Sequence, residues 1–195
     1  MKIAMKKIFL MMAVAVLGAA SASAQKLSTG FAGGTNTSSF SGDLGDEVKS
    51  TGGLQLSAVF DYALNESFSV TPELFVFEGG AKPKNGGGTL TLTYMRLPIN
   101  ATYKFAIKGL NPDSRVLAFA GPYVGYGLLT SEDKPIAFGS GNIFNPWDFG
   151  LNIGVGQQIG EAFYKFQYSH GLTNVQYNKD GGNMSFSFTV GHFFY

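Results

Sequence analysis

The chain alternates apolar and polar residues over long stretches. In 184–194 one parity is apolar except for His192, whereas Ser, Thr and Gly fill the other parity up to Gly191. Successive side chains of a β-strand point to opposite faces, so this period of two predicts strands with one apolar face and one small or polar face. Alternating or glycine-rich stretches predict eight strands, at about 27–37, 53–64, 68–76, 89–106, 116–129, 148–159, 164–169 and 183–195.

The connections between the predicted strands alternate in length. Those after the second, fourth and sixth strands are short turns, and those after the first, third, fifth and seventh are longer and polar. Barrels of the outer membrane have short periplasmic turns and longer external loops. The pattern predicts an all-β, eight-stranded antiparallel up-and-down transmembrane barrel with both termini on the short-turn side. Leu90 and Leu92 depart from the apolar parity of 97–105, which predicts either a bulge near Tyr94 or a strand that rises out of the bilayer.

Alternation alone does not tell a membrane barrel from a soluble one, because a soluble ligand-binding barrel turns its apolar face inward. In this chain aromatic residues gather on the apolar face toward the strand ends, as they do at a lipid–water boundary. The other face carries mostly Ser, Thr, Asn, Gln and Gly, with fewer charges than a water-facing surface usually has. These features favour the membrane barrel, and a soluble ligand-binding barrel is the alternative.

The N-terminus has the pattern of an export signal. Three lysines accompany an apolar run at 8–20, and residues 22–24, Ala-Ser-Ala, form a small-x-small cleavage site. The run is shorter than the roughly 20 apolar residues that a membrane helix needs. We therefore predict a cleaved signal peptide at 1–24 and an outer-membrane β-barrel domain at 25–195.

Composition agrees with an exported β-protein. Hydrophobic residues make up 45% of the chain and charged residues 14%, with 27 Gly and 18 Phe, which suits strands joined by tight turns. The absence of cysteine excludes disulfides and thiolate metal sites. A net charge of +1 gives no argument for binding nucleic acid. We expect the outer membrane of a Gram-negative cell as the location, with its lipids and the barrel assembly machinery as partners.

Several segments resemble a known family. The segment 94–104 with Pro98 at its centre, the Ala-Gly-Pro-Tyr run that opens 120–127, and the segments 148–151 and 168–174 are similar, in order and spacing, to small outer-membrane β-barrels of the PorT-like family of Bacteroidota. The chain departs from that pattern in having Arg96 where an acidic residue is common, and Tyr195 one position beyond the usual terminal aromatic residue. The resemblance implies an eight-stranded outer-membrane barrel. The functions of the family are diverse.

The polar parity predicts charges inside the barrel. Glu73 and Arg96 are expected on neighbouring strands at similar depth, and buried charges are tolerated only when they are paired and hydrogen-bonded. We predict an interior network around a Glu73–Arg96 pair, completed by Asp61, Lys104 and Lys165. Such a network fills the interior, and a path for protons or solutes is the alternative.

No catalytic constellation stands out. His170 and His192 are the only histidines, and their spacing does not suggest a metal site. Ser169 is adjacent to His170, but neighbouring residues of a strand point to opposite faces, and the chain has no Gly-x-Ser-x-Gly motif. We expect a protein that is not an enzyme and has no cofactor.

The end of the chain is unusually aromatic. Phe193, Phe194 and Tyr195 are predicted to form an aromatic rim on the periplasmic side, where the last strand pairs with the first. We expect the assembly machinery to read this segment.

Apolar residues also punctuate the longest polar loop, at 130–147. Ile136, Phe138, Phe144 and Trp147 are candidates for contact with a partner, or alternatively fold over the mouth of the barrel. The sequence thus favours a non-enzymatic envelope protein that is structural or interacts with an envelope or extracellular protein through its loops. The alternatives are a small-solute porin or transporter, and an accessory component of a protein-secretion or assembly system.

Overall fold

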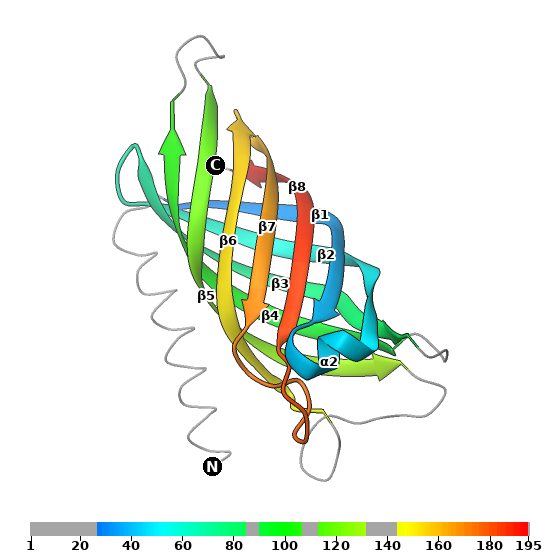
Figure 1. The fold of residues 1–195 in the computed structure, drawn as a ribbon. Helices are drawn as coiled ribbons and strands as arrows, with labels where there is room; N and C mark the ends of the chain where they lie inside the picture. The colour runs from blue at the N-terminus through cyan, green and yellow to red at the C-terminus, as the bar shows by residue number, and fades with distance from the viewer. Residues whose placement is uncertain (1–26, 85–89, 107–112, 132–143, 195) are drawn as a thin grey trace.

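The described strands close into one barrel. The computed structural model describes residues 27–84, 90–106, 113–131 and 144–194. Each strand pairs antiparallel with the next in the chain, and the last pairs with the first, so the predicted eight-stranded up-and-down topology is confirmed (Figure 1). The elements are β1 (Leu27–Phe40), α2 (Gly42–Glu47), β2 (Val48–Ala63), β3 (Phe68–Pro83), β4 (Leu90–Phe105), β5 (Ser114–Ser131), β6 (Trp147–Ile159), β7 (Ala162–Gly171) and β8 (Asn183–Phe194). The predicted signal peptide, 1–24, lies outside the described residues.

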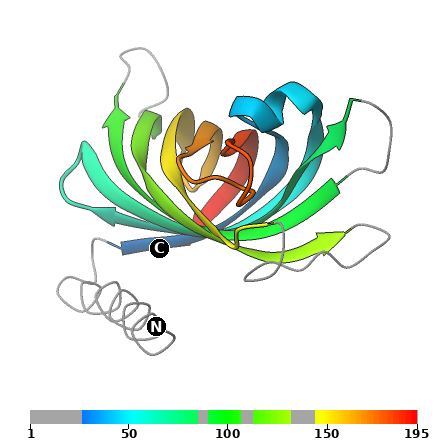
Figure 2. The same cartoon turned by 60° about the horizontal axis from the view of Figure 1, so that its bottom comes forward.

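The two ends of the barrel differ. The β2–β3, β4–β5 and β6–β7 connections lie at one end together with the start of β1 and the end of β8, and we call it the short-turn end. The other, long-loop end carries α2 and the β7–β8 connection (Figure 2). No helix in the described part of the chain is long and apolar enough to cross a membrane.

The first long loop is shorter than predicted. We expected a long polar loop between strands at about 27–37 and 53–64, but β1 continues to Phe40 and β2 begins at Val48. The later part of β1 contains Gly33, Gly34 and Asn36, residue types with low strand propensity, yet it pairs with β8 on one side and with β2 on the other. Ladder hydrogen bonds on both edges therefore override the local preference of the sequence.

The apolar parity faces outward. Leu56, Ile153 and Phe186 are 72%, 62% and 64% exposed, whereas the buried interior positions hold mainly Ser, Thr, Asn, Gln and paired charges. This arrangement is the reverse of a soluble ligand-binding barrel, so that alternative is wrong.

The predicted irregularity near Tyr94 is present, but on the neighbouring strand. The β4–β5 register shifts between Thr93, opposite Leu129, and Tyr94, opposite Gly127, so Leu128 of β5 is the extra residue. β4 itself keeps its alternation, because Leu92 and Tyr94 are both buried inside. The interior simply becomes apolar toward the long-loop end.

Glycines on β6 make room for aromatic rings in a narrow interior. An eight-stranded barrel is only just wide enough for its inward side chains. Gly154 lies opposite Phe119 and Gly150 opposite Tyr123 in the β5–β6 ladder. A Cβ atom would approach the ring of Phe119 to 2.3 Å at Gly154 and the ring of Tyr123 to 2.5 Å at Gly150. The bare backbone at these positions is therefore what lets the rings fill the lumen.

Candidate functional site: the filled interior

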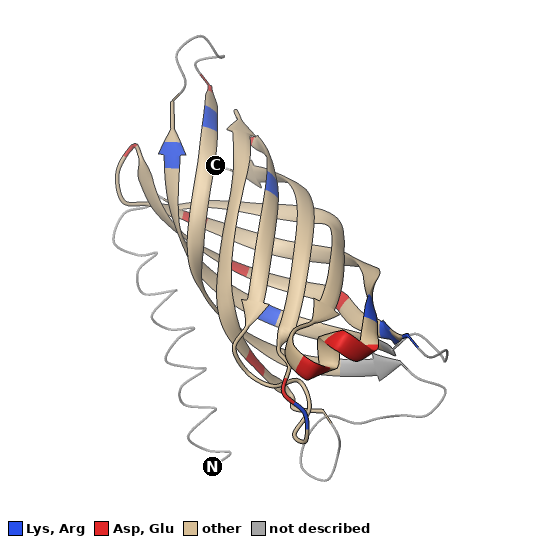
Figure 3. Cartoon of the chain, viewed as in Figure 1, with Lys and Arg blue, Asp and Glu red and all other residues tan. Residues whose placement is uncertain are grey.

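Among the described residues, the charged side chains of the interior form three ion pairs. Arg96 of β4 pairs with Asp148 of β6 at 2.6 Å. Lys165 of β7 pairs with Glu73 of β3 at 2.5 Å, also in the buried interior. A third pair joins Lys104 of β4 to Asp61 of β2 near the short-turn end. Figure 3 shows isolated charged positions along the strands of the barrel and acidic residues on α2. The interior therefore holds matched charges, as the desolvation cost of buried ions requires.

The Arg96–Asp148 pair is the most completely enclosed. Its side chains are only 1% and 2% exposed. Arg96 donates to Oδ2 of Asp148 through Nε at 3.0 Å and Nη2 at 2.6 Å, and Tyr123 donates its hydroxyl to Oδ1 at 3.2 Å. The rings of Phe77 and Tyr123 lie 4.3 and 4.4 Å from the guanidinium carbon, within cation–π range.

This geometry corrects one sequence prediction. Arg96 pairs with Asp148 and not with Glu73, which binds Lys165 instead. The β3–β4 register places Arg96 opposite Phe75, so Glu73 is displaced from it along the strand. Asp148 was missing from the predicted network, although its position on the polar parity of its strand was the signal that could have revealed it.

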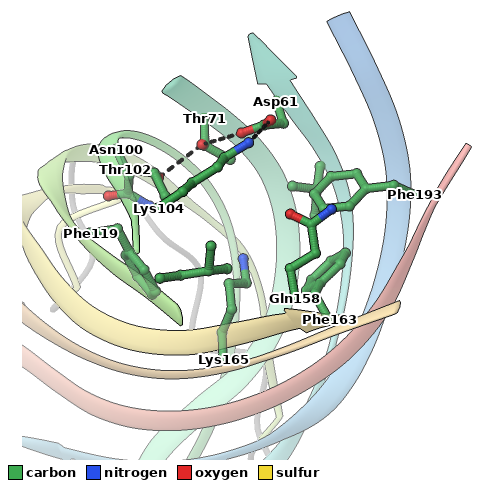
Figure 4. Close-up of a pocket in the computed structure, with 12 residues that line it drawn as sticks. Asp61, Thr71, Asn100, Thr102, Lys104, Phe119, Gln158, Phe163, Lys165 and Phe193 are labelled. Atoms are coloured by element: carbon green, nitrogen blue, oxygen red, sulfur yellow. Dashed lines mark hydrogen bonds and ion pairs between the residues drawn. The ribbon is translucent and has the colours of Figure 1, made fainter. Parts of the chain in front are cut away.

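Threonine hydroxyls accompany the Lys104–Asp61 pair near the short-turn end. Thr71 donates its hydroxyl to Asp61 at 3.2 Å and lies 2.9 Å from the hydroxyl of Thr102 (Figure 4). A cavity of about 20 Å³ remains among these side chains, Lys165 and neighbouring rings. A water molecule needs roughly 10–15 Å³ of such space, so the cavity is the size of about one water.

Two apolar clusters also pack in the interior, one toward each end of the barrel. The short-turn cluster contains Ala32, Val59, Phe163 and Phe193, with the rings of Phe163 and Phe193 4.6 Å apart. The long-loop cluster contains Phe40, Leu44, Phe75, Phe77, Ala81, Leu92, Tyr94, Phe144 and Val175. The described interior is thus occupied along its length.

The long-loop cluster is covered by α2 and the β7–β8 connection, which bind each other. The backbone N–H of Ser41 donates to the carbonyl of Gly182 at 2.9 Å, and that of Leu44 donates to the carbonyl of Asp180 at 3.2 Å. Lys179 of the connection also forms an exposed ion pair with Glu47 of α2 at 2.6 Å. These contacts hold Leu44 over the mouth of the barrel.

The adjacent Ser169 and His170 point to opposite sides of the wall. Ser169 is 3% exposed in the interior and accepts a hydrogen bond from Gln167 at 3.1 Å. His170 is half-buried, and its Nδ1 lies 3.1 Å from the hydroxyl of Tyr168. The two side chains therefore do not form a hydrogen-bonded dyad.

Comparison with known proteins places the chain in a family. The family described as "Outer membrane protein beta-barrel domain" matches residues 21–177. The chain belongs to this family. Its location is accordingly the outer membrane, and the outward apolar face is the face that meets lipid.

Two solved structures illustrate the shared fold of this outer-membrane barrel. Neisserial surface protein A is 13% identical with a TM-score of 0.55, and the match covers 85% of this chain and 97% of that one. The outer membrane enzyme PagL is 14% identical with a TM-score of 0.52, covering 83% of this chain and 98% of that one. At such identities the likeness concerns the fold alone. A search of curated proteins found no match.

The predicted aromatic rim is only partly correct for the membrane barrel. Phe194 faces outward, with its ring 6.1 Å from that of Phe31. Phe193 points into the lumen and is 5% exposed, because neighbouring residues of β8 alternate faces. Tyr195 lies outside the described residues. His192 faces outward, 3.3 Å from Glu161 and beside Phe194.

Of the four predicted contact residues in the 130–147 loop, the structure describes two. Phe144 is 3% exposed and belongs to the long-loop cluster, as the interpretation of folding over the mouth predicts. Trp147 begins β6, and its ring packs 5.0 Å from Tyr126 and 5.9 Å from Phe149. Ile136 and Phe138 lie outside the described residues.

Proposed function

We propose that this outer-membrane barrel is a non-enzymatic envelope protein that conducts no solutes and acts structurally or through its long-loop end. The observation that carries the proposal is the filled interior, where the described residues form three ion pairs and two apolar clusters. The cavity beside the Lys104–Asp61 pair is the size of about one water, which is too small for a solute. The long-loop end, with α2 and the β7–β8 connection, is the part that such a protein would present to a partner outside the cell.

Electrical conductance of the purified protein in planar lipid bilayers tests the closed interior. We expect no sustained current from the natural chain, because side chains occupy the lumen. A known outer-membrane porin reconstituted in the same bilayers serves as the positive control for conductance. A heat-dependent gel shift verifies that both proteins are folded barrels. Sustained current through the natural chain would contradict the proposal and favour a small-solute porin or transporter.

The opposite orientations of Ser169 and His170 support the absence of acyl-transfer or hydrolytic activity. One structural relative is described as an outer membrane enzyme, but a likeness at 14% identity does not bear on activity. Mass spectrometry of envelope lipids, with the protein present or deleted, provides the test. We expect identical lipid profiles. A modified lipid that appears with the natural chain and disappears with His170→Ala would show that the protein is an enzyme.

A role as an accessory component of a protein-secretion or assembly system is a second candidate. The sequence resemblance of 94–104 and 120–127 to the PorT-like family supports it. Deletion of the protein should then reduce specific proteins in the culture supernatant while they accumulate inside the cell. An unchanged set of secreted proteins after deletion would leave the structural or loop-mediated role.

A further inference from the structure

A groove of about 440 Å³ crosses the outer wall of the barrel, over β6, β7, β8 and β1. Two rows of outward side chains form its sides. The first row contains Phe166 and Phe188, whose rings are 4.8 Å apart, and the second contains Tyr168 and Phe186, whose rings are 4.7 Å apart. Within each row the two residues are direct partners in the β7–β8 ladder.

The floor of the groove is the backbone between the two rows. Gln167 and Ser187 lie between the rings on their strands, are partners in the ladder, and have positions of inward parity. Rows separated by two residues of a strand are roughly 6.6–6.8 Å apart. An aliphatic chain lying between the rows would thus be about 3.3–3.4 Å from each, close to the optimal separation of carbon atoms of roughly 3.5 Å.

The ends of the groove differ in chemistry. Ile153 and Val155 of β6 close one end with exposed apolar side chains. At the other end β1 presents Thr35 and Thr37, which are smaller than the rings opposite them on β8. The step from phenylalanine to threonine makes the wall concave and leaves two exposed hydroxyls at the edge of the groove.

We propose that this groove is a preferred binding site for one acyl chain of an outer-membrane lipid. The apolar face of an outer-membrane barrel lies against hydrocarbon, so the wall has no water to fill a concave surface. Aromatic rings on both sides and the apolar β6 end offer more contacts to a chain than a convex wall does. The proposal concerns the lipid-facing wall, and it holds whether or not the lumen conducts.

Quenching of tryptophan fluorescence by brominated phospholipid tests the proposal. The chain has one tryptophan, so Trp147→Phe gives a background into which a single reporter can be placed. Ile153→Trp places the reporter at the groove, and Leu74→Trp places the control on the wall of β3. The two reporters lie at matched positions along their strands. Ile153 is six residues from Ile159, and Leu74 is six residues from Phe68, where Ile159 and Phe68 are the short-turn ends of β6 and β3. Both variants are reconstituted in phosphatidylcholine vesicles containing an increasing fraction of dibrominated phosphatidylcholine.

We expect the relative binding constant of the brominated chain to be about two- to three-fold higher at the groove reporter than at the control, because contacts between pairs of heavy atoms are individually weak and add up. A heat-dependent gel shift verifies that both variants are folded. Equal constants at the two positions would overturn the proposal. A lower binding constant at the groove would also overturn the proposal. Crosslinking of Thr37→Cys chains with one another in the vesicles would show that a second copy of the protein occupies the groove in place of an acyl chain.

Discussion

Removal of the negative charge at Asp148 provides the sharpest test of how the interior is stabilised. Asp148→Asn keeps the shape of the side chain but leaves the guanidinium of Arg96 buried without its counter-ion. Arg96 and Asp148 are 1% and 2% exposed, and breaking such a buried pair on one side typically costs about 3–5 kcal/mol. We expect a loss of that size in the free energy of unfolding.

An exposed pair of the same length serves as the matched control. Lys179 and Glu47 also lie 2.6 Å apart, but their side chains are 42% and 61% exposed. Solvent screens such a pair, so Glu47→Gln should cost less than about 1 kcal/mol. The two variants differ in burial and not in distance, which makes burial the quantity under test.

The double variant Arg96→Met/Asp148→Asn separates the loss of the ion pair from the penalty of leaving one buried charge unpaired. It removes both charges, so no unpaired ion remains inside the barrel. We expect it to be more stable than Asp148→Asn alone, because most of the single-variant cost is the penalty of the orphaned charge.

Equilibrium unfolding by guanidinium in detergent micelles measures all three variants. The fluorescence of the single tryptophan, Trp147, and the heat-dependent gel shift provide two independent readouts. Equal losses for Asp148→Asn and Glu47→Gln would refute the reasoning. A double variant no more stable than Asp148→Asn alone would refute it too.

Two further predictions follow from the packing of rings in the lumen. Gly154→Ala should destabilise the barrel by about 1–3 kcal/mol through overpacking, since its Cβ would lie 2.3 Å from the ring of Phe119, and adding Phe119→Leu should restore part of the stability in the same unfolding assay. Phe193→Ala should cost about 3–5 kcal/mol as a buried ring, and Phe194→Ala, on the outer rim, should cost clearly less. Equal costs at Phe193 and Phe194 would mean that the inward orientation of Phe193 is wrong.

The terminal strand shows how far local pattern reaches. Its period of two indicated that Phe186 and Phe188 lie on one face, and the structure has both exposed on the outer wall. The same period should have separated Phe193 from Phe194, but composition suggested one aromatic rim. The structure confirms the alternation, because backbone geometry applies to every residue of a strand whatever its type.

The charged interior shows where local pattern stops. The polar parity put Glu73 and Arg96 inside, where both are buried. Which carboxylate meets which cation depends on the register and tilt of strands that are far apart in the chain. Arg96 and Asp148 are 52 residues apart, and Lys165 and Glu73 are 92. No feature of a single strand determines which of these residues meet.

The sequence by itself determined the strands, their faces and the closed topology of this outer-membrane barrel, because hydrophobic alternation and loop length are read residue by residue. Only the tertiary structure decided that Phe144 caps the lumen, that Asp148 holds Arg96, and that two aromatic rows border a groove on the lipid-facing wall. Those contacts arise when strands from the whole chain curve around one axis and bring side chains together across the lumen or along a ladder. These contacts depend on closure of the barrel, which is a property of all the strands together.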